Sequence, residues 1–146
     1  MSRKILVTGA AGFIGFHLAR NLLEKTDYEV IGIDNFNNYY DVNLKKDRME
    51  NLNGLARKLD KKSFTIHDID LTNYVSLNKL FLDEEPDVIC HLAAQAGVRY
   101  SIEMPHSYVS NNITATLNLL EACSKNDIKE FIFASTSSVY GLSDAM

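Results

Sequence analysis

Three glycines follow an apolar run near the start of the chain and constrain the fold more than any other feature. The run Lys4–Thr8 predicts a buried strand, and the segment Phe13–Lys25 predicts the helix that follows it. Three glycines spaced G-x-x-G-x-x-G join these two elements: Gly9, Gly12 and Gly15. Because they lack Cβ atoms, they let the backbone turn tightly, let the helix pack close to the strand and leave the helix N-terminus facing a phosphate group.

An acidic residue after the next apolar run completes the pattern of a dinucleotide site. The run Glu29–Ile33 predicts a second strand, and Asp34 follows it, nineteen residues after Gly15. A carboxylate there can accept hydrogen bonds from both hydroxyls of an adenosine ribose, whereas a 2′-phosphate would meet a like charge. Because residues 35–38 contain no Arg or Lys, the sequence favours NAD over NADP. The alternative is that the glycines serve an ordinary turn between a strand and a helix.

Apolar runs and amphipathic segments alternate along all 146 residues. Further strands are predicted at Ser63–His67, Val88–Leu92 and Phe131–Ala134. Short apolar strands that alternate with helices form parallel sheets covered on both faces, and right-handed crossovers then give the strand order 3-2-1-4-5. We therefore expect one α/β domain, residues 1–146, built on a doubly wound parallel sheet of the Rossmann type.

Three further helices are expected between these strands. One begins at the cap Asp41 and runs toward Leu59, with Asn53–Gly54 as a potential break, and another begins at the cap Thr72. A long helix starts at Pro105. This long helix carries four apolar residues on one face: Val109, Ile113, Leu117 and Leu120.

Composition and charge narrow the function classes. The formal net charge of −4 gives no electrostatic reason to expect nucleic acid or an anionic membrane as a partner. There is no signal peptide and no long apolar span, so we expect a cytoplasmic protein. Cys90 and Cys123 lie in apolar segments without metal-ligand spacing, so we expect reduced core residues and no metal site.

Ligands of a doubly wound sheet bind at the carboxyl ends of its strands, and these ends carry the candidate residues. Small residues after the fourth strand would let a cofactor lie against the backbone, and hydroxyl groups follow the fifth strand, where a nicotinamide is expected. The residues predicted to bind the cofactor are Gly9, Gly12, Phe13, Ile14, Gly15, Asp34, Asn35, Asp70, Leu71, Leu92, Ala93, Ala94, Gln95 and Ser135.

Three stretches resemble the extended short-chain dehydrogenase/reductase family of nucleotide-sugar enzymes: Thr8–Gly15, His91–Gln95 and Ser135–Gly141. Two more, Ile33–Val42 and Ala94–Ser101, look like the UDP-glucuronate 4-epimerase branch. The resemblance covers essentially the whole chain. It implies interconversion of UDP-glucuronate and UDP-galacturonate. A tyrosine removes the proton of the sugar 4-hydroxyl, NAD takes a hydride from C4, and the hydride returns to the other face of the 4-keto sugar.

The resemblance also implies residue roles. Thr136 matches the catalytic Ser/Thr position, and Asn111 falls where the family has an Asn near the cofactor. We expect Thr136, Ser137, Ser138 and Arg99 to contact the UDP-sugar. Dehydratases and decarboxylases of the family carry an acid within the hydroxyl run, and its absence here argues against both chemistries. A UDP-glucose 4-epimerase, another nucleotide-sugar epimerase or dehydratase, and a non-catalytic NAD-binding module stay open as alternatives.

One departure from the family pattern is serious. The family base belongs to a Tyr-x-x-x-Lys pair, and none of the seven tyrosines here has Lys four residues later. We therefore expect an N-terminal portion that stops before the sixth strand and the sugar-nucleotide domain, inactive alone and part of a homodimer when complete.

Several residues allow a simpler explanation. His91 is better explained as a hydrogen-bonded core residue than as a catalytic one. Arg99 would bind substrate or form a surface salt bridge, and the pair Tyr39–Tyr40 would cover the adenosine or pack on the next helix. Lys45 is expected on a solvated face, and Ser137 and Ser138 would otherwise cap a turn.

Overall fold

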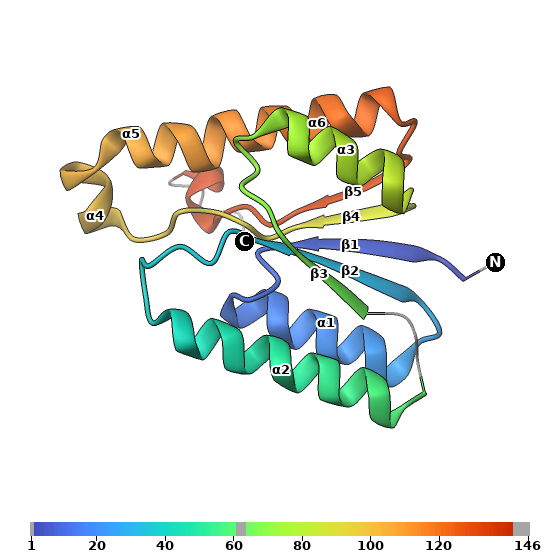
Figure 1. The fold of residues 1–146 in the computed structure, drawn as a ribbon. Coiled ribbons are helices and arrows are strands. Elements are labelled where there is room, and N and C mark those ends of the chain that lie inside the picture. The colour runs from blue at the N-terminus through green and yellow to red at the C-terminus, as the bar shows by residue number, and fades with distance from the viewer. Residues whose placement is uncertain (1, 61–63, 142–146) are drawn as a thin grey trace.

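Five parallel strands form one twisted sheet in the order β3-β2-β1-β4-β5, which confirms the predicted fold (Figure 1). The computed structural model describes residues 2–60 and 64–141. The strands are β1 Lys4–Thr8, β2 Glu29–Asp34, β3 Phe64–Asp68, β4 Val88–His91 and β5 Glu130–Phe133. Every strand pairing is parallel, so all five carboxyl ends meet at one edge of the sheet.

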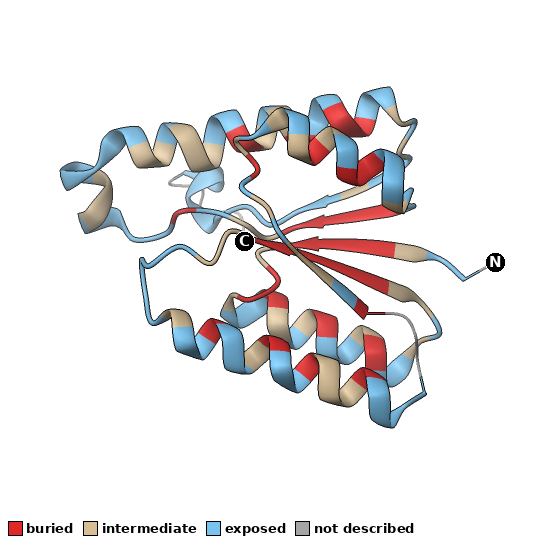
Figure 2. Cartoon of the chain, viewed as in Figure 1, coloured by how far each residue is buried: buried red, intermediate tan, exposed pale blue. Residues whose placement is uncertain are grey.

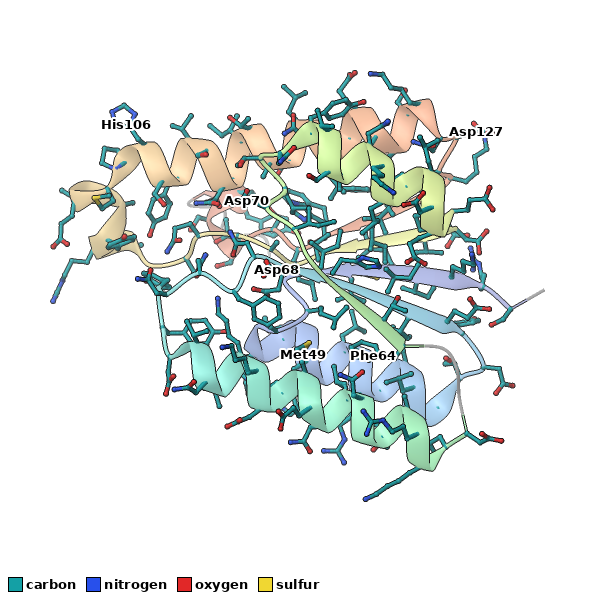
Figure 3. The ribbon with its side chains drawn as sticks, viewed as in Figure 1. Met49, Phe64, Asp68, Asp70, His106 and Asp127 are labelled. Atoms are coloured by element: carbon teal, nitrogen blue, oxygen red, sulfur yellow. The ribbon has the colours of Figure 1, made fainter. Side chains whose placement is uncertain are left out.

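Helices cover both faces of this sheet. Helices α1 (Phe13–Lys25) and α2 (Val42–Lys58) lie on one face, and α3 (Tyr74–Glu84) and α6 (Ala115–Lys125) lie on the other (Figure 1). Each pair encloses its own apolar layer against the central strands, which are buried along most of their length (Figure 2). Met49 of α2 and Phe64 of β3 belong to the first layer (Figure 3).

The connection from β4 to β5 is built from four helical segments in series. They are α4 (Val98–Glu103), α5 (Pro105–Tyr108), the π-helix η1 (Val109–Thr114) and α6. A short 3₁₀ helix, η2 (Ser137–Tyr140), follows β5. The π-helical turn was not predicted. π-Helical turns within α-helices are frequent at functional sites.

Two local expectations were wrong. Asn73 caps α3, because its Oδ1 accepts the Ser76 amide at 3.2 Å, while the Thr72 hydroxyl donates to Asp70. The pair Asn53–Gly54 does not break α2, which continues to Lys58. A glycine inside a helix costs only about 1 kcal/mol, less than the burial of the apolar stripe around it provides.

The predicted apolar face of the long helix does not pack on the sheet. Val109, Ile113, Leu117 and Leu120 are all exposed. A second stripe with the same helical spacing packs instead: Ala115, Leu119, Ala122 and Cys123. Because both stripes are apolar, periodicity alone could not identify the one that faces the sheet.

Both cysteines are buried and unpaired, as predicted, and burial raises the pKa of the Cys123 thiol to about 11. Within residues 2–60 and 64–141, no helix combines the length and the hydrophobicity that crossing a membrane requires.

Candidate functional site

A cavity opens at the carboxyl edge of the sheet, where the sequence analysis predicts that a ligand binds. Its volume is about 140 Å³. Eleven of the fifteen predicted cofactor residues line it: Gly9, Gly12, Asp34, Asn35, Asp70, Leu71, Leu92, Ala93, Ala94, Gln95 and Asn111. Residues from all four connections between the strands therefore meet around one space.

The glycine loop forms the floor of this cavity. Gly9 has φ +68°, and a Cβ there would lie 3.0 Å from the Ala93 backbone. A Cβ on Gly15 would lie 2.1 Å from the Gly9 carbonyl oxygen, so this glycine allows α1 to pack against the loop. Gly15 is buried behind the cavity and does not line it. Phe13 and Ile14 are exposed at the start of α1 and also lie outside the lining.

The Asp34 carboxylate is fixed at the edge of the cavity. Its Oδ2 accepts the Ala11 amide at 3.1 Å, and its Oδ1 accepts the Phe36 amide at 2.9 Å. Phe36 has φ +46°, so the chain turns sharply after β2 and closes around the carboxylate. The side chain is only 8% exposed, so its orientation is set before any ligand binds.

Lys45 is not on a solvated face, contrary to the prediction. It is 3% exposed, and its Nζ lies 3.7 Å from Asp34 Oδ1. The ammonium group also donates to the Asn37 carbonyl at 2.9 Å and lies 4.7 Å from the centre of the Tyr40 ring. Helical spacing could have predicted this burial, because Lys45 begins the buried stripe of α2 that continues with Met49 and Leu52.

The loop after β3 holds a second carboxylate at the cavity. Asp70 lies where the chain leaves the sheet (Figure 3). Burial tends to raise the pKa of Asp70, but hydrogen bonds from the Thr72 hydroxyl and amide and from the Asn35 amide together lower it. Asn118 of α6 donates to the carbonyls of Leu71 and Thr72 at 3.0 Å and fixes this loop.

His91 is a hydrogen-bonded core residue, as expected. The Thr8 oxygen accepts the amides of Leu92 and Ala93, both at 3.1 Å, so its hydroxyl proton is free to donate to His91 Nδ1 at 2.7 Å. The proton of the neutral ring therefore sits on Nε2 and is donated to Thr116 Oγ1 at 3.0 Å. This chain of contacts positions the backbone that lies against Gly9.

Gln95 lines the cavity, and its side chain is almost wholly buried. Its backbone is clamped by Asn112, whose side chain accepts the Gln95 amide at 2.7 Å and donates to the Gln95 carbonyl at 3.0 Å. Its own Nε2 is buried and makes no hydrogen bond of ordinary geometry with the described residues, although the side chain lies near the Tyr108 hydroxyl. A buried donor without an acceptor is costly, and the Tyr108 hydroxyl is the nearest group that could satisfy it.

Two tyrosine hydroxyls bind the loop after β4 at the side of the cavity, one from the loop after β2 and one from α5. Tyr39 donates to the Ala96 carbonyl at 3.0 Å, and Tyr108 donates to the same oxygen at 2.7 Å. The Tyr39 and Tyr100 rings lie 5.0 Å apart. Tyr39 and Tyr40 both line the cavity, and Tyr40 also packs against Lys45 and Arg48 of α2, so the second of the two expectations holds for Tyr40 and a role beside the adenosine stays a prediction.

Gly97 makes this arrangement possible, and replacing it should be costly. It has φ +101°, and an added Cβ would lie 2.7 Å from the Tyr39 hydroxyl. We expect Gly97→Ala to lower the free energy of unfolding by about 1–3 kcal/mol, measured by urea denaturation. Gly54→Ala is the matched control: it points into open space inside α2 and should stabilise the chain by about 0.5–1 kcal/mol. Equal effects of the two changes would contradict this account.

The hydroxyl run lies outside the cavity. Ser135, Thr136, Ser137 and Ser138 are all exposed after β5. Thr136 caps η2, because its Oγ1 accepts the Ser138 amide at 3.3 Å, so the residue that caps this turn is not one of the two serines. Arg99 is exposed in the first turn of α4 and does not join the lining. The structure therefore groups most of the cofactor residues but not the four predicted substrate residues.

Known proteins match this chain along nearly its whole length. The sequence profile of the family described as GDP-mannose 4,6 dehydratase matches residues 6–146. The chain belongs to this family. It is 49% identical over 138 residues to Protein CapI of Staphylococcus aureus and 44% identical over 135 residues to the UDP-glucuronate 4-epimerase of Thermodesulfobacterium geofontis (strain OPF15). These matches cover 94% and 92% of the chain but 39% and 40% of the relatives, so it spans about two-fifths of their length.

Solved structures of 4-epimerases share the fold. The UDP-glucuronic acid 4-epimerase of Bacillus cereus, in complex with UDP-glucuronic acid and NAD, is 44% identical with a TM-score of 0.76, over 97% of this chain and 43% of that one. The UDP-Glc/GlcNAc 4-epimerase of Campylobacter jejuni is 34% identical with a TM-score of 0.83, over 99% and 40%. The resemblance found in the sequence motifs is thereby confirmed.

Several residues of this family member that shape the cavity were missed by the sequence analysis. Asn112, Thr116 and Asn118 each fix a loop by contacts with residues far away in the chain, and no local pattern marks them. Ile33, Asn37, Ile69 and Ala115 line the cavity without a chemical signature. In the described part of the chain, no cluster of His, Cys, Asp or Glu has the composition of a metal site.

Proposed function

We propose that the chain is the NAD-binding part of a nucleotide-sugar 4-epimerase. One observation carries the proposal: a single cavity joins a glycine loop without room for Cβ atoms to a carboxylate held by two backbone amides. A dinucleotide fits these groups, since it offers a pyrophosphate to the loop and ribose hydroxyls to Asp34. The epimerases of similar fold support the assignment.

Each part of the cofactor has a group of this chain to hold it. The first amides of α1 would face the pyrophosphate, where the helix dipole favours negative charge. Asp34 would accept the ribose hydroxyls, Asp70 and Leu71 would meet the adenine edge, and Asn111 would lie beside the cofactor. Bound NAD would supply the hydride acceptor and donor for C4 of the sugar. Thr136 would hydrogen-bond the sugar oxygen that gains and loses a proton.

The proposed substrate of the complete enzyme is UDP-glucuronate. The similarity to UDP-glucuronate 4-epimerases over more than nine-tenths of this chain supports it, as does the run of hydroxyl groups without an acid. The complete enzyme is proposed to be a homodimer, which would cover the exposed apolar face formed by Val109, Ile113, Leu117 and Leu120. The cytoplasmic location expected from the sequence stays a prediction.

Selectivity for a C5 carboxylate tests the substrate. Hydrogen bonds to a charged group contribute about 1.5–3 kcal/mol each, so we expect at least a tenfold preference in kcat/KM for UDP-glucuronate over UDP-glucose. The measurement uses residues 1–141 joined to the C-terminal part of the Thermodesulfobacterium geofontis epimerase. Ser137→Ala, Ser138→Ala and Arg99→Leu should each reduce the preference, whereas Ser124→Ala, at an exposed position of α6, should not.

The two parts of this proposal fail separately. A parent enzyme that prefers UDP-glucose would refute the assignment to UDP-glucuronate. A preference for UDP-glucuronate that none of the three substitutions reduces would leave the substrate in place and remove these residues from its recognition.

A further inference from the structure

One hydrogen bond joins the two loops on either side of the glycine loop. The Tyr39 hydroxyl, between β2 and α2, donates to the Ala96 carbonyl, between β4 and α4, at 3.0 Å. These two loops run side by side at the carboxyl edge of the sheet (Figure 1). Because β1 lies between β2 and β4 in the sheet, a bond between their loops passes across the end of β1, where the glycine loop begins. The bond therefore spans the place proposed for the pyrophosphate.

The two ends of this bond are supported differently. On the β2 side, the buried Lys45 ammonium donates to the backbone and side-chain oxygens of Asn37 at 2.9 and 3.0 Å. On the β4 side, Gly97 leaves room for the Tyr39 hydroxyl, since an added Cβ would lie 2.7 Å from it. Tyr39 itself is 45% exposed, and its ring lies 5.0 Å from the Tyr100 ring. The bond across the cavity is open to water, so it breaks more easily than the buried anchor at Lys45.

The cavity is too small for a dinucleotide while this bond is made. Its volume of about 140 Å³ is less than half of the roughly 300–1,000 Å³ usual for ligand pockets. Tyr39 belongs to its lining, together with Gly9 and Gly12 of the glycine loop. A cofactor made of two nucleotides can therefore enter only if part of the lining moves. Residues 35–41 form no helix or strand, and residues 37–41 are exposed, so this loop is the part of the lining that can move at least cost.

We propose that Tyr39 is a latch on the cofactor cavity: its bond to Ala96 opens to admit NAD and closes again over the bound pyrophosphate. Loops that close over a ligand in this way control its entry and its release. A latch that is equally strong in the free and the bound protein slows association and dissociation by the same factor and leaves the affinity nearly unchanged. The inference rests on the proposed NAD site and adds the step by which the cofactor reaches it.

The test measures how fast NADH binds to and leaves the 146-residue chain, by stopped-flow fluorescence, with calorimetry for the Kd. Tyr39→Phe removes the hydroxyl and keeps the ring. It should raise both rates about three- to tenfold, which corresponds to one hydrogen bond, and change the Kd less than about threefold. Tyr39→Ala also removes the ring contact with Tyr100, so it should raise both rates by a further factor of about three. Thermal unfolding checks that each variant folds.

Two other tyrosines provide the comparisons. Tyr108 donates to the same Ala96 carbonyl at 2.7 Å, but this bond lies within the connection from β4 to β5 and does not join the two loops. Tyr108→Phe loosens the loop after β4 without opening the latch, so it should not reproduce the parallel rise of both rates. Tyr74→Phe is the matched control for the loss of a hydroxyl. Tyr74 lies on α3 and its hydroxyl contacts Lys125, so this change should alter both rates less than twofold.

The outcomes separate the latch from the proposed function. If the parent does not bind NADH, the proposed function and the inference fall together. If it binds NADH but both rates stay within twofold of the parent in Tyr39→Phe and Tyr39→Ala, NAD binding stands and the latch is refuted. A rise in the release rate alone would make Tyr39 a contact of the bound cofactor and would also refute the latch. An equal parallel rise in Tyr108→Phe would assign the effect to the loop after β4 and refute the role of the bond between the loops.

Discussion

The 146-residue chain should bind NAD and yet form no detectable UDP-galacturonate from UDP-glucuronate. None of its seven tyrosines has a lysine four residues later, so we expect no base for the sugar hydroxyl within these 146 residues. A general base contributes about 10²–10⁴-fold, and holding two reactants in place adds effective molarities of up to about 10⁵–10⁸ M. The purified chain is incubated with NAD and UDP-glucuronate, and the sugar nucleotides are separated by chromatography.

The fusion of residues 1–141 to a relative's C-terminal part is the positive control. It should restore turnover, and Thr136→Ala in the fusion should reduce kcat far more than Thr136→Ser, which keeps the hydroxyl. Turnover by the chain alone would show that its base lies within these residues and that the tyrosine argument is wrong. An inactive but folded fusion would favour a non-catalytic NAD-binding module.

The sheet and its ligand edge could be predicted from the sequence because their signals are local. Apolar strands, the glycine spacing and the acid at the end of β2 all lie within about thirty residues, and right-handed crossovers leave few topologies for such a pattern. The loop contacts that complete the cavity could not be predicted in this way. Asn112 reaches back seventeen residues and Asn118 forty-seven, and an Asn on a helix carries no mark of its distant partner.

Lys45 shows a different kind of failure. A lysine beside another lysine is most often solvated. The prediction for Lys45 therefore followed its residue type and ignored its position in the buried stripe of α2. The ion pair with Asp34 and the Asn37 carbonyl compensate its burial. Likewise, the two apolar stripes along η1 and α6 have equal periodicity, so only the packed structure identifies the one that covers the sheet.

The structure should lose stability in mild acid through one buried group, His91. Burial lowers the pKa of His91 from the ordinary 6.5 to about 4. Below pH 6.5 the unfolded chain takes up a proton that the folded chain refuses until about pH 4, so the free energy of unfolding falls as the pH falls through this window. The shift corresponds to about 3 kcal/mol, fully lost only below pH 4. Urea denaturation at pH steps from 7.5 to 4 measures it.

His91→Gln should be less stable at pH 7 but should show a shallower loss between pH 6.5 and 4, because the titrating group is gone. His106→Gln is the control, since His106 is exposed on the outer surface of α5 and should leave the slope unchanged (Figure 3). Carboxylates contribute to the pH dependence of the free energy of unfolding in all three proteins. The difference between the parent and His91→Gln therefore gives the contribution of the buried histidine. Identical slopes for these two would refute the assignment.

The same proton should weaken cofactor binding before the fold is lost. A charged His91 donates from both ring nitrogens, so Thr8 would have to accept Nδ1–H in addition to the amides of Leu92 and Ala93, three donors for two lone pairs. One of these two amides must then lose its hydrogen bond to Thr8, and the backbone that lies against Gly9 shifts. We therefore expect NAD affinity to fall as the pH falls from about 5 through 4 in the parent and much less in His91→Gln, measured by titration at pH values where both remain folded.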